Sequence, residues 1–346
     1  MTTEYAPIDA DGHVMETDDE LRRYLPAPFE ERRALTALFP SLDGWPRSTR
    51  KAPDSTPGLV KWRMFLDASG VAGSVLYPTM GLSVAPIKDV KWAAVMARCY
   101  NDYLYGEYLQ REPQRLFGVA LLPVQDIAAA ADELERCVKD LKMVGGVIPA
   151  AGLPKGLGHP MYDPIYQTAV RLNVPLAVHG GSSAGLGLDL FDSFVKILVM
   201  EHAVAQQIHF TSFLLDGGPA RFPTLKIAFL EAGVGWVPYL MERLDEKYEK
   251  LPHQAPLLSK APSEYVLAGS IYFSCELEEK ILPYVIGLGL EHNLMYPSDY
   301  PHERPTLEEF LSDIPKFHAR EDLSAQAKKL ILRENCIDFY ALNAAK

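Results

Sequence analysis

Residues 8–14 read Ile-Asp-Ala-Asp-Gly-His-Val, a short apolar, β-branched stretch in which polar side chains recur at every second position. Asp11 and His13 are two residues apart, so a β-strand directs both side chains to the same face. A carboxylate and an imidazole are ligand types that divalent metals accept. The stretch therefore predicts a strand whose last residues form part of a metal site, with further ligands expected at the ends of other strands.

Short apolar runs alternate with longer helical patterns along the chain, which is typical of βα units and a parallel sheet. Eight runs are predicted to be strands: residues 8–14, 72–78, 116–123, 143–150, 175–180, 226–233, 271–277 and 293–301. Helices are predicted over residues 90–111, 128–141, 164–172, 194–215, 237–250, 277–287, 307–317 and 324–342. We therefore predict an α/β fold, a single (β/α)₈ TIM barrel domain over residues 1–346, with a doubly wound open sheet as the alternative.

A long segment, residues 15–65, separates the first two predicted strands by more than a barrel requires. It contains Pro26, Pro28, Pro40, Pro46, Pro53 and Pro57. An insertion after the C-terminal end of a strand falls on the catalytic face of a barrel, so the segment could form a lid or a wall of the substrate site. A surface excursion or a dimer contact is an equally open interpretation.

Composition narrows the possible partners. The 346 residues contain 34 Lys+Arg and 45 Asp+Glu, a net charge of −11, which argues against nucleic acid because phosphate binding needs a basic face. No apolar run approaches the roughly 18 residues that span a bilayer, and the N-terminus lacks a signal-peptide pattern. The four cysteines are far apart and are predicted to be buried thiols in a reducing compartment. We therefore expect a cytoplasmic protein that acts on a small molecule without membrane contact.

Acidic and imidazole side chains stand at the ends of five predicted strands, where the side chains of a barrel converge on one pocket. They are Asp11, His13, His179, Glu231, Glu276 and Asp299. Each alone has a simpler interpretation, since a lone histidine is commonly a core residue and a lone acid commonly caps the next helix. That capping interpretation is strong for Glu276, which precedes Leu-Glu-Glu-Lys. For the others together, burial without a cation would be costly, so a metal site is favoured.

Several motifs make the chain similar to a known family. They are IDADGH at residues 8–13, HGG at 179–181, GGPARFPTLK at 217–226, GVGWVP at 233–238 and SDYPH at 298–302. With these motifs the chain resembles the amidohydrolase superfamily nearly from end to end. The resemblance is to the amidohydrolase-related (amidohydrolase 2) branch, which also contains aminocarboxymuconate semialdehyde decarboxylase and the hydroxybenzoate-type decarboxylases.

The resemblance implies a distorted barrel with a divalent metal at its C-terminal face. Asp11 and His13 match the first-strand ligands, His179 the strand-five ligand and Asp299 the strand-eight aspartate. Two positions depart from the family pattern, because Asp11 replaces the usual His or Glu, and Glu231 replaces a strand-six His. With Glu276, the acids form a surplus of negative charge that one divalent ion does not cancel, so one or two ions are possible. We expect Zn most, with Mn or Fe as alternatives.

The unusual residues at positions 11 and 231 favour hydrolysis over decarboxylation. An anionic Glu231 would repel a carboxylate substrate, so we predict a hydrolase that cleaves an amide, ester or thioester by a metal-activated water, with Asp299 as general base. A non-oxidative decarboxylase of a small aromatic or unsaturated carboxylate is the first alternative, and a non-catalytic binding barrel is the second.

Additional residues are predicted to contribute to the pocket. His202 and His302 are further candidates for the catalytic site, and His209 is expected to pack in the core or at the surface. Trp62, Phe65 and Tyr77 are expected either near the pocket or in the core. A homodimer is expected from the resemblance.

Overall fold

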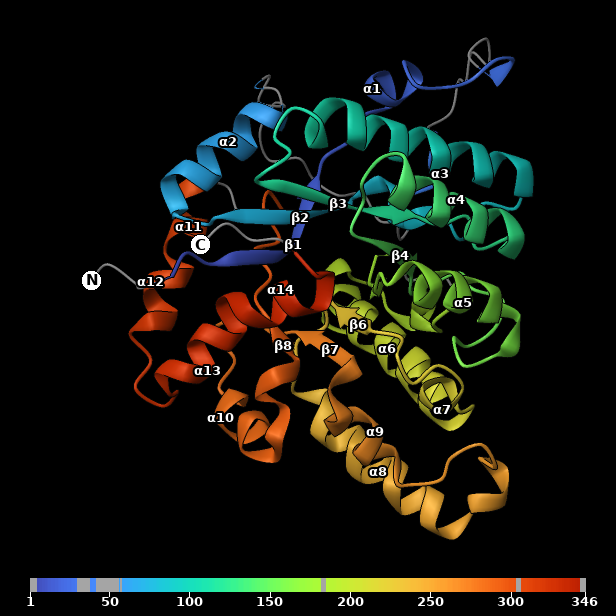
Figure 1. Cartoon of the computed structure of the whole chain (residues 1–346), viewed down its shortest axis with the longest axis vertical. Helices are drawn as coiled ribbons and strands as arrows, with labels where there is room; N and C mark the ends of the chain where they lie inside the picture. The colour runs from blue at the N-terminus through green and yellow to red at the C-terminus, as the bar shows by residue number, and fades with distance from the viewer. Residues whose placement is uncertain are drawn as a thin grey trace.

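Eight parallel strands form the centre of the molecule and pair in the order β1 to β8 (Figure 1). The structure is a computed structural model that describes residues 5–29, 38–41, 56, 58–181, 185–302 and 306–342. The strands are β1 (Ile8–Val14), β2 (Gly73–Pro78), β3 (Leu116–Leu121), β4 (Gly145–Pro149), β5 (Leu176–His179), β6 (Ile227–Leu230), β7 (Ile271–Ser274) and β8 (Leu294–Met295).

Backbone hydrogen bonds join the segment that follows β8 to β1. The N–H of Ala10 donates to the carbonyl of Tyr296 at 2.9 Å, and the N–H of His13 donates to the carbonyl of Tyr300 at 2.8 Å. The sheet thus curls into a nearly closed ring, as a barrel requires. The predicted α/β barrel is confirmed, and the open sheet is excluded.

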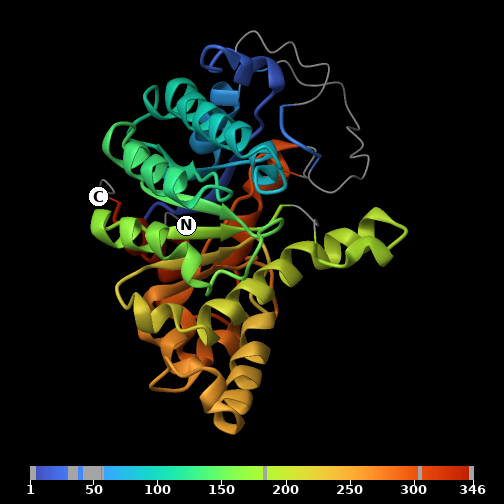
Figure 2. The same ribbon diagram turned by 90° about the vertical axis from the view of Figure 1, so that its right-hand side faces the viewer.

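Helices surround the strands, which are buried on both faces as parallel strands usually are (Figures 1 and 2). They are α1 (Asp18–Arg22), α2 (Gly58–Ser69), α3 (Val90–Leu104), α4 (Ile127–Lys139), α5 (Asp163–Leu172), α6 (Phe194–Leu215), α7 (Gly218–Arg221), α8 (Trp236–Lys250), α9 (Pro262–Tyr265), α10 (Leu282–Val285), α11 (Leu307–Leu311), α12 (Asp313–His318), α13 (Ala325–Lys329) and α14 (Asn335–Tyr340). The first half of α6 projects from the barrel (Figure 2).

None of the described helices is long and apolar enough to cross a bilayer. All four cysteines are free and buried, as predicted.

Several predicted elements are longer than the observed ones, and two of them show how the backbone departs from the pattern. The eighth strand was predicted over residues 293–301 but ends at Met295, because the next N–H, that of Tyr296, bonds to Ile331 outside the sheet. The helix predicted at 277–287 begins only at Leu282. The segment before it is a turn in which the Glu279 side chain accepts the N–H of Glu276 at 2.9 Å.

The insertion is described only in part. Residues 30–37, 42–55 and 57 lie outside the described residues, so the predicted lid stays a prediction. The described end of the insertion is α2, whose Trp62 and Phe65 rings pack on Tyr300 with centroids 5.0 Å and 4.5 Å away. The end of the insertion therefore supports the segment that follows β8.

Gly12 lies at a tightly packed irregularity in β1. The pairing of β1 with β2 shifts register between Asp9 and Gly12, so β1 contains one extra residue. A Cβ atom at Gly12 would lie 2.5 Å from Ser74 Oγ and 2.7 Å from Asp9 Oδ2, and it would also meet Trp62. Only glycine fits this position without moving the strand.

We expect Gly12→Ala to lower the free energy of unfolding by about 1–3 kcal/mol, the usual cost of overpacking. Gly287→Ala is the matched control, because a Cβ at Gly287 meets nothing within 4 Å. Denaturant titration of both variants measures the difference. Equal stability of the two variants would contradict the tight fit at Gly12.

Candidate active site

The buried centre of the site consists of Asp11 and His13 on β1 and His179, the last residue of β5. Asp11 Oδ1 lies 3.2 Å from His179 Nε2 and 3.6 Å from His13 Nε2, and none of the three side chains is exposed. One ligand atom from each residue lies within 4.8 Å of the others, so the group could hold a metal ion. The structure thus brings together three of the predicted ligands.

Backbone carbonyls determine which nitrogen of each imidazole faces this centre. His13 Nδ1 lies 3.0 Å from the carbonyl oxygen of Pro78, and His179 Nδ1 lies 2.7 Å from that of Gly180. A carbonyl only accepts, so both Nδ1 atoms carry a proton and each Nε2 is left for Asp11 or a cation. Carbonyl partners orient metal-binding histidines in the same way.

Burial and neighbouring charges set the charge states in the centre. Burial, together with the fields of His302 and His179, holds the pKa of His13 well below its usual range. Burial also lowers the pKa of His179, but the fields of Asp11 and Glu231 outweigh it and raise the pKa to about 9. Without a cation the centre therefore keeps a proton on His179, which a bound metal would displace.

Unpaired buried atoms test whether a cation fits. Asp11 Oδ2, His13 Nε2 and Asp299 Oδ1 are buried, and none has a hydrogen-bond partner among the described residues. Each such atom costs roughly 1–3 kcal/mol unless something satisfies it. Two imidazoles with carboxylate oxygens suit a divalent transition metal. The residues present therefore fit the metal that the sequence implied.

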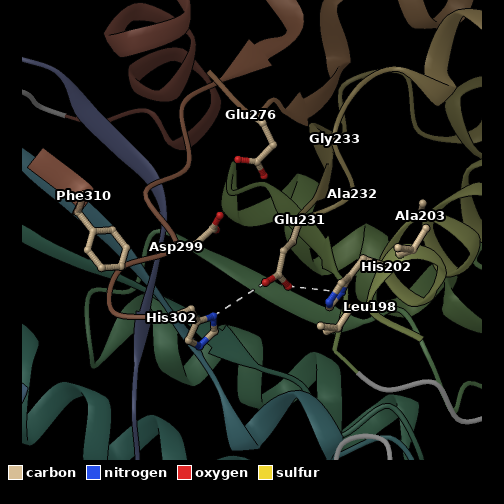
Figure 3. A pocket seen from close by; sticks show the side chains of 11 residues that line it. Leu198, His202, Ala203, Glu231, Ala232, Gly233, Glu276, Asp299, His302 and Phe310 are labelled. Atoms are coloured by element: carbon tan, nitrogen blue, oxygen red, sulfur yellow. Dashed lines mark ion pairs between the residues drawn. The ribbon is translucent and has the colours of Figure 1, made fainter. Parts of the chain in front are cut away.

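Glu231 directly follows β6 and lies between the imidazoles of His202 and His302 (Figure 3). Its Oε2 lies 3.4 Å from His179 Nδ1 and 3.5 Å from His202 Nδ1, and its Oε1 lies 3.9 Å from His302 Nδ1. Burial opposes ionisation, but the fields of His202 and His179 hold the pKa of Glu231 well below its usual range. Glu231 is therefore a carboxylate whose charge is compensated by its neighbours.

Asp299 follows β8 in a constrained backbone conformation. Its φ is +50° and that of Glu231 is +54°, a left-handed region that residues other than glycine rarely adopt and that is enriched at functional sites. The N–H of Asp299 donates to the carbonyl of Asp11 at 2.9 Å. Burial and the fields of Asp11 and Glu276 hold the pKa of Asp299 well above its usual range. Burial and the neighbouring carboxylates thus favour the protonated form of Asp299 when no cation is present.

A cavity of about 320 Å³ opens beside these residues. Its walls include the predicted residues His202, Glu231, Glu276, Asp299 and His302, together with Leu198 and Phe310 (Figure 3). No lysine or arginine among the described residues lines it. The buried centre is not part of this lining but contacts it, because His13 stacks on His302 with ring centroids 3.9 Å apart.

Of the remaining predicted residues, one lines the cavity and the others are buried in the core. Glu276 lines the cavity and does not cap a helix, since α10 begins six residues later, at Leu282. His209 is buried and bonds to the carbonyl of Ala150, so of its two predicted placements the core one holds. Trp62, Phe65 and Tyr77 are buried in the core and are not among the lining residues, so the core interpretation holds for them.

Asp9 is a functional residue that the sequence reasoning missed. Its carboxylate accepts hydrogen bonds from Ser74 Oγ at 2.5 Å, Ser298 Oγ at 2.7 Å and the N–H of Ser298 at 2.8 Å. It thereby fixes the segment that carries Asp299 against β1. Asp9 stands two residues before Asp11 in the sequence, and this spacing could have drawn attention to it. The spacing alone, however, does not distinguish a metal ligand from a residue that positions other side chains.

The amidohydrolase family model matches residues 8–342, and the chain belongs to this family. Gamma-resorcylate decarboxylase of Polaromonas sp. (strain JS666 / ATCC BAA-500) is 26% identical over 79% of this chain and 85% of its own length. The 2-amino-3-carboxymuconate-6-semialdehyde decarboxylase of Dictyostelium discoideum is 23% identical over 77% of this chain and 73% of its own length. The predicted family branch is therefore confirmed.

A solved structure supports the fold. Dihydroxybenzoic acid decarboxylase from Polaromonas sp. JS666, with bound manganese and the inhibitor 2-nitroresorcinol, superposes with a TM-score of 0.72. It is 22% identical, and the match covers 98% of each chain.

The predicted hydrolysis of an amide, ester or thioester is wrong by these comparisons, because the two relatives described above are decarboxylases. The prediction failed on a charge argument. It assumed that Glu231 presents an uncompensated negative charge to the substrate, whereas His179, His202 and His302 lie around its carboxylate.

Proposed function

We propose that this protein is a metal-dependent, non-oxidative decarboxylase of a small aromatic or unsaturated carboxylic acid. The observation that carries the proposal is the buried Asp11–His13–His179 centre, which fits a cation and to which Asp299 is joined by the bond of its N–H to the carbonyl of Asp11. The decarboxylase relatives support the same reaction class.

We propose one ion, held by Asp11, His13 and His179. A second group, His13, Glu231 and His302, has metal-ligand spacing, but it also uses His13. His13 Nδ1 is committed to Pro78, so only Nε2 can bind, and the two groups cannot both be filled through it. When bound, the ion supplies positive charge that attracts and polarises the oxygens of an acidic substrate. Manganese is the first metal to test, because the neighbouring decarboxylase structure contains it.

Asp299 supplies the proton that the reaction consumes. In decarboxylation the C–C bond to the carboxylate breaks, CO₂ leaves, and the electron pair stays on the substrate carbon, which then takes a proton. Asp299 lines the cavity, and burial and neighbouring acids raise its pKa, which favours the protonated form. A positioned acid of this kind accelerates such a step by about 10²–10⁴-fold.

The imidazoles around Glu231 make the cavity acceptable to an anion. His202 and His302 both line the cavity and lie 3.5 Å and 3.9 Å from the Glu231 carboxylate. They offset the charge of Glu231 where no lysine or arginine of the described residues lines the wall. An acidic substrate therefore approaches a Glu231 carboxylate that already lies beside two imidazoles.

The direct test is CO₂ release by Mn²⁺-loaded enzyme from 2,6-dihydroxybenzoate, other hydroxybenzoates and unsaturated dicarboxylates. We expect CO₂ from at least one of them, with one deuteron per product molecule on the former carboxyl-bearing carbon when the reaction is run in D₂O. Consumption of substrate without CO₂ would contradict the proposal. A protein that binds no stoichiometric metal and turns over nothing would favour a binding barrel.

A further inference from the structure

Glu16 is a buried carboxylate just beyond β1 that the proposed reaction does not use. It is 5% exposed, and it reaches across to the segment that follows β2. Its Oε2 accepts the N–H of Thr79 at 3.1 Å, and its Oε1 accepts the N–H of Gly81 at 2.6 Å. Glu16 therefore satisfies the free N–H groups at the start of the short 3₁₀ helix Met80–Ser83.

This arrangement changes the role of Thr79. Thr79 stands at the N-cap of that helix, where a threonine usually bonds an N–H of its own helix through its hydroxyl. Here the Thr79 side chain makes no such bond. Its Oγ1 lies 2.8 Å from His302 Nε2 instead, and it donates to Met15 Sδ at 3.4 Å. The Thr79 hydroxyl and His302 Nε2 are therefore hydrogen-bonded to each other, and the tautomer of the imidazole sets which of them donates.

Two neighbouring residues thus orient the two stacked imidazoles of the site. The carbonyl of Pro78 fixes His13 at 3.0 Å, and the hydroxyl of Thr79 fixes His302. With its Nε2 held by Thr79, His302 directs Nδ1 toward Glu231 Oε1 at 3.9 Å. The position of this imidazole at the cavity wall depends on the conformation of residues 78–81.

We propose that Glu16 is a positioning residue for His302. Its carboxylate takes over the capping of the helix after β2 and so leaves the Thr79 hydroxyl to hold the imidazole at the cavity wall. Without the Glu16 carboxylate, the Thr79 hydroxyl is drawn to the uncapped N–H groups, and His302 loses its Nε2 partner. The catalytic consequence rests on the proposed function, whereas the effect on His302 does not.

The test compares Glu16→Gln, Thr79→Val and the double variant at pH 8. This pH keeps Glu16 ionised, because burial raises its pKa to about 7. We expect each single variant to lower kcat/KM for CO₂ release by about 10²-fold, the cost of misplacing a group by about 1 Å. Metal content should stay within about twofold, because neither residue is one of the proposed metal ligands. The double variant should have a kcat/KM no lower than that of Thr79→Val, because both changes act through the same hydroxyl. Thr79→Ser keeps the hydroxyl and is the matched control, with near-normal kcat/KM.

Imidazole ¹⁵N NMR of His302 in the ligand-free enzyme gives an independent measurement. Glu16→Gln and Thr79→Val should both shift the His302 Nε2 resonance, and Thr79→Ser should not. Unchanged His302 resonances in a folded Glu16 variant, full activity of Thr79→Val, or additive losses in the double variant would each overturn the proposal. Glu16→Asp replaces Glu16→Gln if that variant does not fold, and failure of both would assign Glu16 to folding instead. If the wild type releases no CO₂, the proposed function fails while the NMR comparison still tests Glu16.

Discussion

Replacing Asp299 by Asn is expected to reduce CO₂ release by about 10³-fold, within the range for loss of a positioned acid. The amide cannot supply the proton that the product carbon takes up. Asn keeps the shape of the side chain and tolerates the left-handed φ of +50°, so the fold should be retained. Single-turnover assays with metal-loaded enzyme, together with metal analysis, measure the effect.

Asp67→Asn is the control for this prediction, because its carboxylate is 68% exposed and lies outside the site. It should leave CO₂ release unchanged. Bound metal in Asp299→Asn should stay near the wild-type content if Asp299 acts mainly as the acid. Loss of the metal would assign Asp299 to the ligand set, and retained turnover would remove it from the chemistry.

Replacing His179 by Ala is expected to abolish both metal binding and CO₂ release. The variant removes one imidazole from the group in which Asp11 Oδ1, His13 Nε2 and His179 Nε2 converge. In the wild type, Mn²⁺ at 100 times its Kd should stabilise the fold by about 2.7 kcal/mol, and this increment should vanish in the variant. Elemental analysis and thermal unfolding with and without Mn²⁺ measure the two effects.

His209→Gln is the matched control, since His209 is also a buried imidazole but lies outside the metal-ligand groups of the described residues. It should keep the metal-dependent stabilisation even if its basal stability falls. Stoichiometric metal in His179→Ala would show that the ion lies elsewhere. Chelation of the wild type followed by Mn²⁺ should restore turnover, because the ion is exchangeable.

The sequence was sufficient to predict most of the fold. Alternating apolar runs predicted all eight strands, and α6 begins at Phe194 and ends at Leu215 as predicted. The eighth strand was predicted too long because its apolar and aromatic residues continue past Met295, whereas the N–H of Tyr296 bonds to Ile331 outside the sheet. Hydrophobic pattern locates a buried segment but does not say where its backbone hydrogen bonds go.

The candidate site could be predicted only in part. Asp11 and His13 lie on β1 and His179 ends β5, and closure of the barrel brings their side chains together. The surroundings of Glu231 depend on side chains from α6 and from the segment after β8, which no spacing in the sequence relates to one another. Glu16 was missed for the same reason, since its partners follow a different strand. The roles of these residues, the homodimer and the cytoplasmic location stay predictions.

The hydrogen bonds between Asp9 and Ser298 affect when the barrel can close during synthesis of the chain. These residues are 289 positions apart, yet their contact joins the first strand region to the last and fixes the segment that bears Asp299. Contacts of such long sequence separation form late and slowly. During synthesis, the first strand therefore has an open edge until the eighth strand has left the ribosome, and such edges favour aggregation. Ring closure also places Asp299 beside β1, so the acidic pocket is complete only once the eighth strand has joined the first.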